Sequence, residues 1–158
     1  GASGMVAKYN GLSTDHIEHL DETAIIQMSQ TRTVATLLPL AFYFLSDTNS
    51  PPIDLLRKHK VPMAVSTDFN PGTSPFTSIR QALNAACTLF KLTPAEAFAG
   101  VTRHAAQALN RENTHGQLKP GFVANLAIWE AKRPVEIFYE LSYNPLIRRV
   151  FLGKPTKA

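Results

Sequence analysis

Ionisable side chains stand where two apolar runs of the sequence end. Asp15 and His16 follow "GLST", and Asp68 follows "VPMAVST". In parallel α/β folds the ligand lies beyond the carboxyl ends of the strands, so we expect these residues to share one rim. A carboxylate there can bind a divalent cation, and an imidazole can move a proton or stabilise an oxyanion. The pattern predicts hydrolysis at a metal, with Asp68 and His16 as the catalytic residues.

Each of these residues also has a purely structural explanation. Aspartate readily caps turns, so a capping role for Asp68 accounts for the same pattern. A hydrogen-bonded histidine at a strand end accounts equally well for His16. The spacing of His16 and His19 suits a pair of zinc ligands on a helix, but here it falls at a strand exit. The local pattern leaves the structural and the catalytic roles open.

The turn after the second strand exit, "FNPGTSP", predicts a cradle for an anion. We expect a helix to begin at Pro75, with Thr73 or Ser74 as its N-cap. The amides of its first turn and the open backbone at Gly72 then point toward the rim, and such an end binds carboxylates and phosphates. Asn70 adds a side-chain amide. The turn favours a small substrate with a hydrolysable carbonyl and a negatively charged arm.

Helices and largely apolar strands alternate along the first two thirds of the chain. Asp21 has the chemistry of an N-cap, and Thr93 and Glu96 form the pattern of a capping box with Pro94 at the first helical position. Strands are expected to end at 15–16, 39 and 68, and helices are expected at 20–30, 53–60, 74–90 and 94–109. A loop through Pro51 and Pro52 precedes the second helix. This order is typical of a parallel sheet covered by helices.

The last third of the chain has a different pattern. A Lys-Pro-Gly turn precedes the alternating run "NLAIWE", and "VEIFYEL" and "IRRVFLGKPT" continue in the same style, with a turn expected at Gly153 and Lys154. These features predict strands of a small β element. We therefore divide the chain into 1–114, the part with parallel strands and helices, and 115–158, the strands of a second domain.

Composition narrows the class of protein. The chain has 158 residues, 44% of them hydrophobic, which suits a globular protein with a real core. Its net charge of +4 comes from scattered basic residues, which argues against a nucleic-acid partner. The single cysteine, Cys87, excludes an internal disulfide and fits a reducing compartment such as the cytoplasm. The most apolar run, "TLLPLAFYFL", is too short to cross a membrane. The opening residues "GASGMVAKYN" are typical of the middle of a longer chain.

Several strings resemble a known family. "STDFNPGTSP" and "STDHIEHLDE" cover the two strand exits, and "VTRHAAQALN" and "GQLKPGFVANLAIW" follow in order. They resemble the imidazolonepropionases of the amidohydrolase superfamily, at strands eight and six, the last helix and the return to a small β-sandwich. The resemblance implies the C-terminal part of a (β/α)8 TIM-type barrel, about strands six to eight with their helices, followed by strands of the β-sandwich.

The resemblance also implies roles for individual residues. The family uses one Zn²⁺ or Fe³⁺ to open the cyclic amide of 4-imidazolone-5-propanoate to N-formimidoyl-L-glutamate in histidine degradation. It implies that Asp68 is the strand-eight metal ligand and shuttles a proton. His16 would polarise the ring carbonyl or assist proton transfer. Asn70 and Gly72 would contact the ring-opened product, and Thr73 the anionic substrate.

Parts of the family pattern have no counterpart here. The family's His-x-His pair after strand one and its histidine after strand five are absent, although a catalytic zinc needs about three protein ligands. We therefore expect the missing N-terminal half of the same protein to be a partner, and an isolated chain to be inactive. Asn125 replaces the superfamily's usual turn Asp, a change that we expect to be tolerated. A purine-type deaminase and a non-catalytic barrel scaffold remain alternatives, and the sequence leaves open whether the protein is a homodimer.

Overall fold

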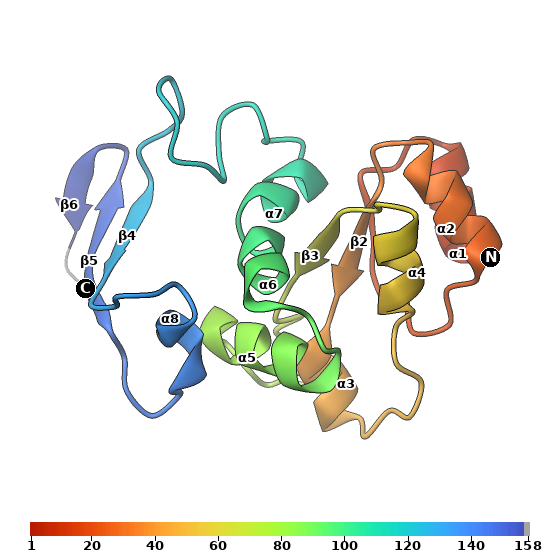
Figure 1. Ribbon diagram of the computed structural model, residues 1–158, viewed down its shortest axis with the longest axis horizontal. Helices are drawn as coiled ribbons and strands as arrows, with labels where there is room; N and C mark the ends of the chain where they lie inside the picture. Colours follow the sequence, from red (N-terminus) through yellow and green to blue (C-terminus); the bar gives the residue numbers. More distant parts are fainter. Residues whose placement is uncertain (157–158) are drawn as a thin grey trace.

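A parallel sheet forms the centre of the chain. The computed structural model describes residues 1–156. The sheet consists of β1 (Ser13–Thr14), β2 (Val34–Leu37) and β3 (Met63–Val65), in the order β1-β2-β3. Every residue of β2 and β3 is buried, which explains why both strands are continuous runs rather than alternating ones. The expected α/β class with a parallel sheet is confirmed (Figure 1).

Two helices begin where their capping residues predict. α2 (Glu22–Ser29) has Asp21 as its N-cap, and the Asp21 carboxylate accepts a backbone N–H of the first turn at 2.8 Å. α6 (Pro94–Gly100) has Thr93 as its N-cap and a complete capping box with Glu96. In each case the side chain pairs an N–H that has no partner within the helix. Local sequence is sufficient to place these helix starts.

Two other helices lie where the sequence predicts none. α3 (Pro39–Phe44) follows β2 directly, at the start of the expected loop. Proline at the first helical position sacrifices no hydrogen bond, and the short helix buries Pro39, Leu40 and Ala41. α1 (Ala2–Lys8) precedes β1. The remaining loop leads to α4 (Ile53–Lys58), a helix that the sequence does predict.

The helix after β3 begins later than expected. α5 (Ile79–Leu89) starts four residues beyond Pro75, so neither Thr73 nor Ser74 caps it, and that prediction is wrong. The physical reason is a tight antiparallel bridge between Asn70 and Ser74, which holds this stretch in a turn.

The segment predicted as one helix over 94–109 is two helices. α6 ends at Gly100 and α7 (Arg103–Ala108) starts after an irregular Thr102. A Cβ on Gly100 would lie 2.9 Å from Val65 Cγ2, so glycine lets α6 pack closely on β3. Leu109, expected on the inner face, is exposed instead: it stands just after the end of α7, although α7 itself contacts β2 and β3.

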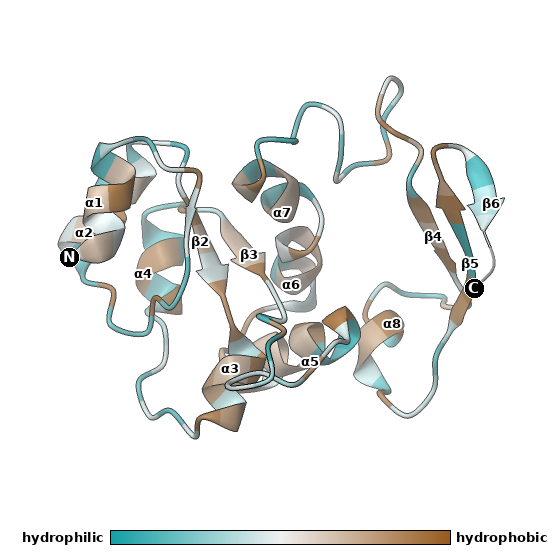
Figure 2. Ribbon diagram, turned by 180° about the vertical axis from the view of Figure 1, so that it is seen from behind, coloured by the Kyte–Doolittle hydropathy of each residue, from teal (hydrophilic) through white to brown (hydrophobic). Residues whose placement is uncertain are grey.

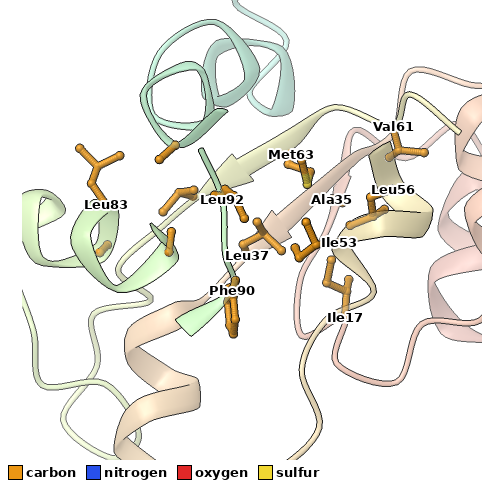
Figure 3. Packing of buried hydrophobic residues seen from close by; sticks show 14 of the residues in the cluster. Ile17, Ala35, Leu37, Ile53, Leu56, Val61, Met63, Leu83, Phe90 and Leu92 are labelled. Atoms are coloured by element: carbon orange, nitrogen blue, oxygen red, sulfur yellow. The ribbon is translucent and has the colours of Figure 1, made fainter. Parts of the chain in front are cut away.

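The core lies between the sheet and its helices. Its largest fully buried side chains come from several elements and include Ile17, Met28, Leu37 and Leu56. Figure 3 shows how the cluster joins strands to helices; the labelled residues are Ile17, Ala35, Leu37, Ile53, Leu56, Val61, Met63, Leu83, Phe90 and Leu92. This packing fixes the position of the sheet. It therefore also fixes the points at which the loops leave the strand ends.

A second, antiparallel sheet follows. It contains β4 (Leu126–Trp129), β5 (Leu146–Phe151) and β6 (Lys154–Thr156), in the order β4-β5-β6. The β5–β6 turn is formed by Leu152 and Gly153, both with positive φ, one residue earlier than expected. Beside it, Asn125 Oδ1 accepts the Leu152 N–H at 2.8 Å, so asparagine performs the turn role expected at position 125.

The connection between β4 and β5 contains a helix rather than the predicted strand. α8 (Glu136–Tyr139) occupies the "VEIFYEL" segment. Ile137 and Phe138 are buried within the hydrophobic cluster of the chain, and α8 packs against α5. This burial is a tertiary effect that the alternating pattern does not reveal.

The two sheets lie apart, with α8 between the small sheet and α5 (Figure 1). Among residues 1–156, no helix is both long and apolar enough to cross a membrane. The division of domains at residue 115 stays a prediction.

Candidate active site at the strand ends

The two residues predicted to be catalytic lie together. His16 follows β1 and Asp68 follows β3, on either side of the end of the central strand β2. His16 Nε2 lies 4.0 Å from Asp68 Oδ2. The His16 side chain is 60% exposed and that of Asp68 is 31% exposed, so both remain accessible at the rim. Parallel strands thus bring together two groups that are far apart in the sequence, as the strand-end rule predicts.

Both residues have an uncommon backbone conformation. The φ angle is 51° at His16 and 50° at Asp68, in the left-handed region that most L-residues avoid. A residue held there costs about 1 kcal/mol or more, and such residues cluster at functional sites where surrounding structure fixes them. Among the described residues, eight non-glycine residues have a positive φ, and these two stand at the exits of β1 and β3, on either side of β2. No pattern in the sequence signals these conformations.

The turn after Asp68 is organised around the side chain of Asn70. Asn70 Oδ1 accepts the N–H of Gly72 at 3.0 Å and that of Thr73 at 2.8 Å. Asn70 Nδ2 donates to the Asp68 carbonyl at 2.8 Å and to Thr73 Oγ1 at 2.9 Å. The predicted cradle of free amides at a helix start is therefore wrong, because the helix begins at Ile79 and these amides already have an acceptor.

Ser74, expected only as a possible helix cap, holds this turn together through two hydrogen bonds. Ser74 is fully buried, and its hydroxyl donates to the Thr67 carbonyl at 2.6 Å. Its own carbonyl accepts the Asn70 N–H at 3.1 Å. On the other side, the Asp68 N–H donates to Ser66 Oγ at 3.4 Å. The only sequence signal for this role is a serine in a turn otherwise rich in Pro and Gly.

The Asp68 carboxylate is accessible and has few hydrogen-bond partners, as suits a ligand of a metal ion. Its nearest described neighbours are His16 and the Asn70 amide, whose Nδ2 lies 3.4 Å from Oδ2. The carboxylate is thus turned toward the rim and not consumed by capping backbone N–H groups. Within residues 1–156, however, no group of three His, Cys, Asp or Glu side chains could hold a metal. The described residues therefore do not form a metal site by themselves.

Three of the other four histidines have hydrogen-bond partners in the surrounding structure. His104 Nδ1 lies 3.0 Å from the Met63 carbonyl, and burial lowers the pKa of its imidazole, as suits a neutral core histidine. His59 Nε2 lies 2.7 Å from Glu22 Oε1 and joins α4 to α2, rather than being solvated. His115 Nδ1 lies 2.8 Å from Thr114 Oγ1 in a turn. His19 is exposed beyond the end of β1.

Cys87 has no features of a nucleophile. It packs partly buried against the hydrophobic cluster, and burial raises the pKa of its thiol. A raised pKa disfavours the thiolate that nucleophilic chemistry requires. Cys87 therefore contributes to packing against the core.

Comparison with known proteins identifies the family. Residues 19–141 match the amidohydrolase family. The chain belongs to this family. It is 60% identical over 156 residues to the imidazolonepropionase of Photorhabdus laumondii, covering 99% of the chain and 38% of that relative. It is also 60% identical over 154 residues to the imidazolonepropionase of Klebsiella pneumoniae, covering 98% of the chain and 38% of that relative. The resemblance found in the sequence is confirmed, and the chain spans about 38% of the length of these amidohydrolase relatives.

Solved structures support the same amidohydrolase fold. Escherichia coli guanine deaminase superposes with a TM-score of 0.75 at 19% identity, over 92% of this chain and 38% of the deaminase. Helicobacter pylori aminofutalosine deaminase gives a TM-score of 0.79 at 16% identity, over 99% and 41%. An adenosine deaminase from Xanthomonas campestris with bound zinc gives 0.71 at 18% identity, over 90% and 36%. At these identities the similarity concerns the fold alone.

Proposed function

We propose that the chain is the C-terminal part of a metal-dependent imidazolonepropionase. In this reaction a water oxygen bonds to the ring carbonyl carbon of 4-imidazolone-5-propanoate, and the ring C–N bond breaks. The leaving nitrogen takes a proton, which gives N-formimidoyl-L-glutamate. The observation that carries the proposal is the meeting of His16 and Asp68 at the strand ends, in a chain 60% identical to curated imidazolonepropionases.

The rest of the protein would complete a (β/α)8 barrel. In the described residues, β1 and β3 each have one strand neighbour, β2. Their outer edges therefore have no strand partner, and closure into a barrel removes such edges. A barrel of about eight strands needs about 250 residues. The missing strands fit the length of the relatives, of which this chain covers 38%.

The metal would be Zn²⁺ or Fe³⁺, with Asp68 as one ligand. A bound cation polarises a carbonyl and lowers the pKa of water. Asp68 presents a carboxylate whose Oδ2 also faces His16, so the same group is placed to hold a proton between the attacking water and the leaving nitrogen. The remaining protein ligands would come from outside this chain, because the described residues contain no cluster of three.

His16 would move the proton or polarise the ring carbonyl. Its side chain is exposed at the rim, and its Nε2 points to the Asp68 side. An imidazole nitrogen can donate or accept a hydrogen bond, depending on the tautomer. Its separation of 4.0 Å from Asp68 Oδ2 brings a substrate atom within reach of both groups. The described geometry therefore suits proton transfer beside the metal ligand.

The turn from Asn70 to Thr73 would bind the substrate and product. Gly72 is exposed, and a Cβ added there would meet only Asn70 Oδ1, at 3.5 Å. The Gly72 Cα is thus open to the approach of a ligand, while its N–H already donates to Asn70 Oδ1. The Thr73 hydroxyl and the Asn70 amide lie at the same turn, where they would face the propanoate arm and the ring-opened amide.

Turnover assays of the complete protein test this proposal. We expect hydrolysis of 4-imidazolone-5-propanoate and no deamination of guanine. Replacing Asp68 by Asn should lower metal content and reduce kcat by at least about a hundredfold, since a ligand is lost. Asp47→Asn is a matched control, because the Asp47 carboxylate only accepts the N–H of Asn49.

A second pair of variants tests the histidine. His16→Ala should lower kcat by about a hundredfold or more without loss of metal, whereas His19→Ala should leave activity unchanged. Deamination of guanine without ring opening would favour the deaminase alternative. A complete protein that neither binds metal nor turns over either compound would favour the scaffold.

A further inference from the structure

The peptide unit between Thr67 and Asp68 is held at both of its polar atoms. Its carbonyl oxygen accepts the Ser74 hydroxyl at 2.6 Å, and its N–H donates to Ser66 Oγ at 3.4 Å. Rotation of this peptide plane changes the φ angle of Asp68. The two contacts therefore fix the left-handed φ of 50° that turns the Asp68 side chain to the rim.

Of the two contacts, the one from Ser74 is the stronger. Its distance is short for a hydroxyl donor, whereas the bond to Ser66 is at the long limit for an N–H donor. Ser74 is also fully buried, so its hydroxyl makes this bond from the inside of the turn. Removal of this donor leaves the Thr67 carbonyl without its protein partner, which costs free energy.

Ser74 also connects the carboxylate to the rest of the turn. Its carbonyl accepts the Asn70 N–H at 3.1 Å, and Asn70 Nδ2 donates back to the Asp68 carbonyl at 2.8 Å. The carbonyl groups on both sides of Asp68 are thus fixed, one by Ser74 and one by Asn70. A displacement of Ser74 would loosen both.

We propose that Ser74 is a positioning residue that holds Asp68 in its left-handed conformation and so aims the carboxylate at the rim. What the carboxylate does there rests on the proposed function, but the conformational part of the proposal stands on the contacts of Ser74 alone. The Ser74 side chain acts on Asp68 through the Thr67 carbonyl, to which its hydroxyl donates.

The test uses Ser74→Ala and Ser74→Cys in the complete protein. Cysteine keeps nearly the same volume with a weaker donor, so it carries the test if the alanine variant does not fold. Ser78→Ala is the matched control, because Ser78 precedes α5 in the same loop and its side chain makes no capping hydrogen bond. Thermal melts followed by circular dichroism give a temperature at which every variant is folded, and all further measurements are made at that temperature.

Two measurements on the folded variants decide the outcome. We expect amide exchange at Asn70, Gly72 and Thr73 to accelerate about tenfold in Ser74→Ala. We expect zinc affinity, from competition with a chelator, to fall about ten- to a hundredfold, as it does when support for a ligand is removed. Ser74→Cys should lie between Ser74→Ala and the wild type, and Ser78→Ala should match the wild type. A purely structural role would lower thermal stability without changing zinc affinity at a temperature where the variant is folded.

The failures of the two proposals are distinguishable. If the wild-type protein binds no zinc and opens no ring, the proposed function fails, while amide exchange and a crystal structure of the serine variant still decide the role of Ser74. The Ser74 proposal is overturned if Asp68 keeps its φ near 50° and the turn exchanges at the wild-type rate in Ser74→Ala. It is equally overturned if Ser74→Ala and Ser78→Ala have the same effect.

Discussion

The parallel sheet and the small antiparallel sheet differ in how far this chain covers them. Every residue of β2 and β3 is buried, whereas no residue of β4, β5 or β6 is. Apolar residues on the small sheet, among them Ile128, Ile147 and Phe151, are exposed. Figure 2 shows this apolar character along β4 and β5. The described residues therefore bury the parallel sheet that carries the candidate site. They do not bury the antiparallel sheet.

The strongest test of this comparison is a pair of truncations. Leu56→Ala should lower the free energy of unfolding of the complete protein by about 2–5 kcal/mol, because Leu56 is fully buried in the core. Phe151→Ala should change it by about 0.5 kcal/mol or less, because Phe151 is 58% exposed. Urea titration measures both. A similar cost for the two variants would break the comparison and show that a segment outside this chain covers the small sheet.

The joint between the two regions gives the next prediction. The Arg80 guanidinium on α5 donates to the carbonyls of Ile137, Glu140 and Tyr143. Arg80→Ala should cost about 1.5–3 kcal/mol, the usual range for hydrogen bonds with a charged donor. Amide exchange should accelerate in β4–β6 and stay unchanged in β2 and β3.

Arg80→Lys tests the geometry of this joint. Lysine keeps the charge but not the planar fork that reaches several acceptors. We therefore expect it to restore only part of the loss. Acceleration spread evenly over both sheets would contradict the view that they are separate regions joined at α5.

Low pH should lower the stability of the region around the parallel sheet, where Glu96 on α6 pairs with Arg57. The hydrogen bond from the Arg57 guanidinium lowers the pKa of Glu96 to about 2, from about 4.3 in an unfolded chain. Since the folded pKa is depressed, the stabilisation is complete above about pH 4.3 and is lost as the pH falls toward 2. Glu96→Gln should therefore lower stability at pH 7, and its difference from the wild type should shrink between pH 4 and 2.

Asp54→Asn is the control for this titration. Asp54 pairs with the same arginine, but its side chain is 95% exposed, so its contribution should be small. Thermal unfolding from pH 2 to 7 compares the three proteins. A pH profile of Glu96→Gln parallel to that of the wild type would contradict the assignment.

Features set by neighbouring residues could be predicted from the sequence. Asp21 and the Thr93–Glu96 capping box start their helices as expected because a cap needs only residues within one turn. The meeting of His16 and Asp68 follows from strand order, since both stand at carboxyl ends of parallel strands. Burial on both faces similarly follows from runs of apolar residues.

Features set by distant contacts could not be predicted in this way. α8 forms because Phe138 is buried in the cluster beside α5, although its sequence alternates like a strand. The start of α5 depends on the Asn70–Ser74 bridge, and the left-handed Asp68 depends on the Thr67 carbonyl. These are matters of side-chain geometry, and residue type and spacing do not determine them.

The smallest effect on folding is expected at the rim, where the turn is held by its own side chains. Gly72 does not have a positive φ, and a Cβ there would meet Asn70 Oδ1 at 3.5 Å, an ordinary contact. Gly72→Ala should therefore change the free energy of unfolding by less than about 0.5 kcal/mol. If the ligand approaches this backbone, the same methyl group should raise KM for 4-imidazolone-5-propanoate severalfold while leaving metal content intact. A variant with unchanged stability and unchanged KM would remove Gly72 from the binding surface, whereas lost stability would mean that the turn depends on its glycine rather than on Asn70.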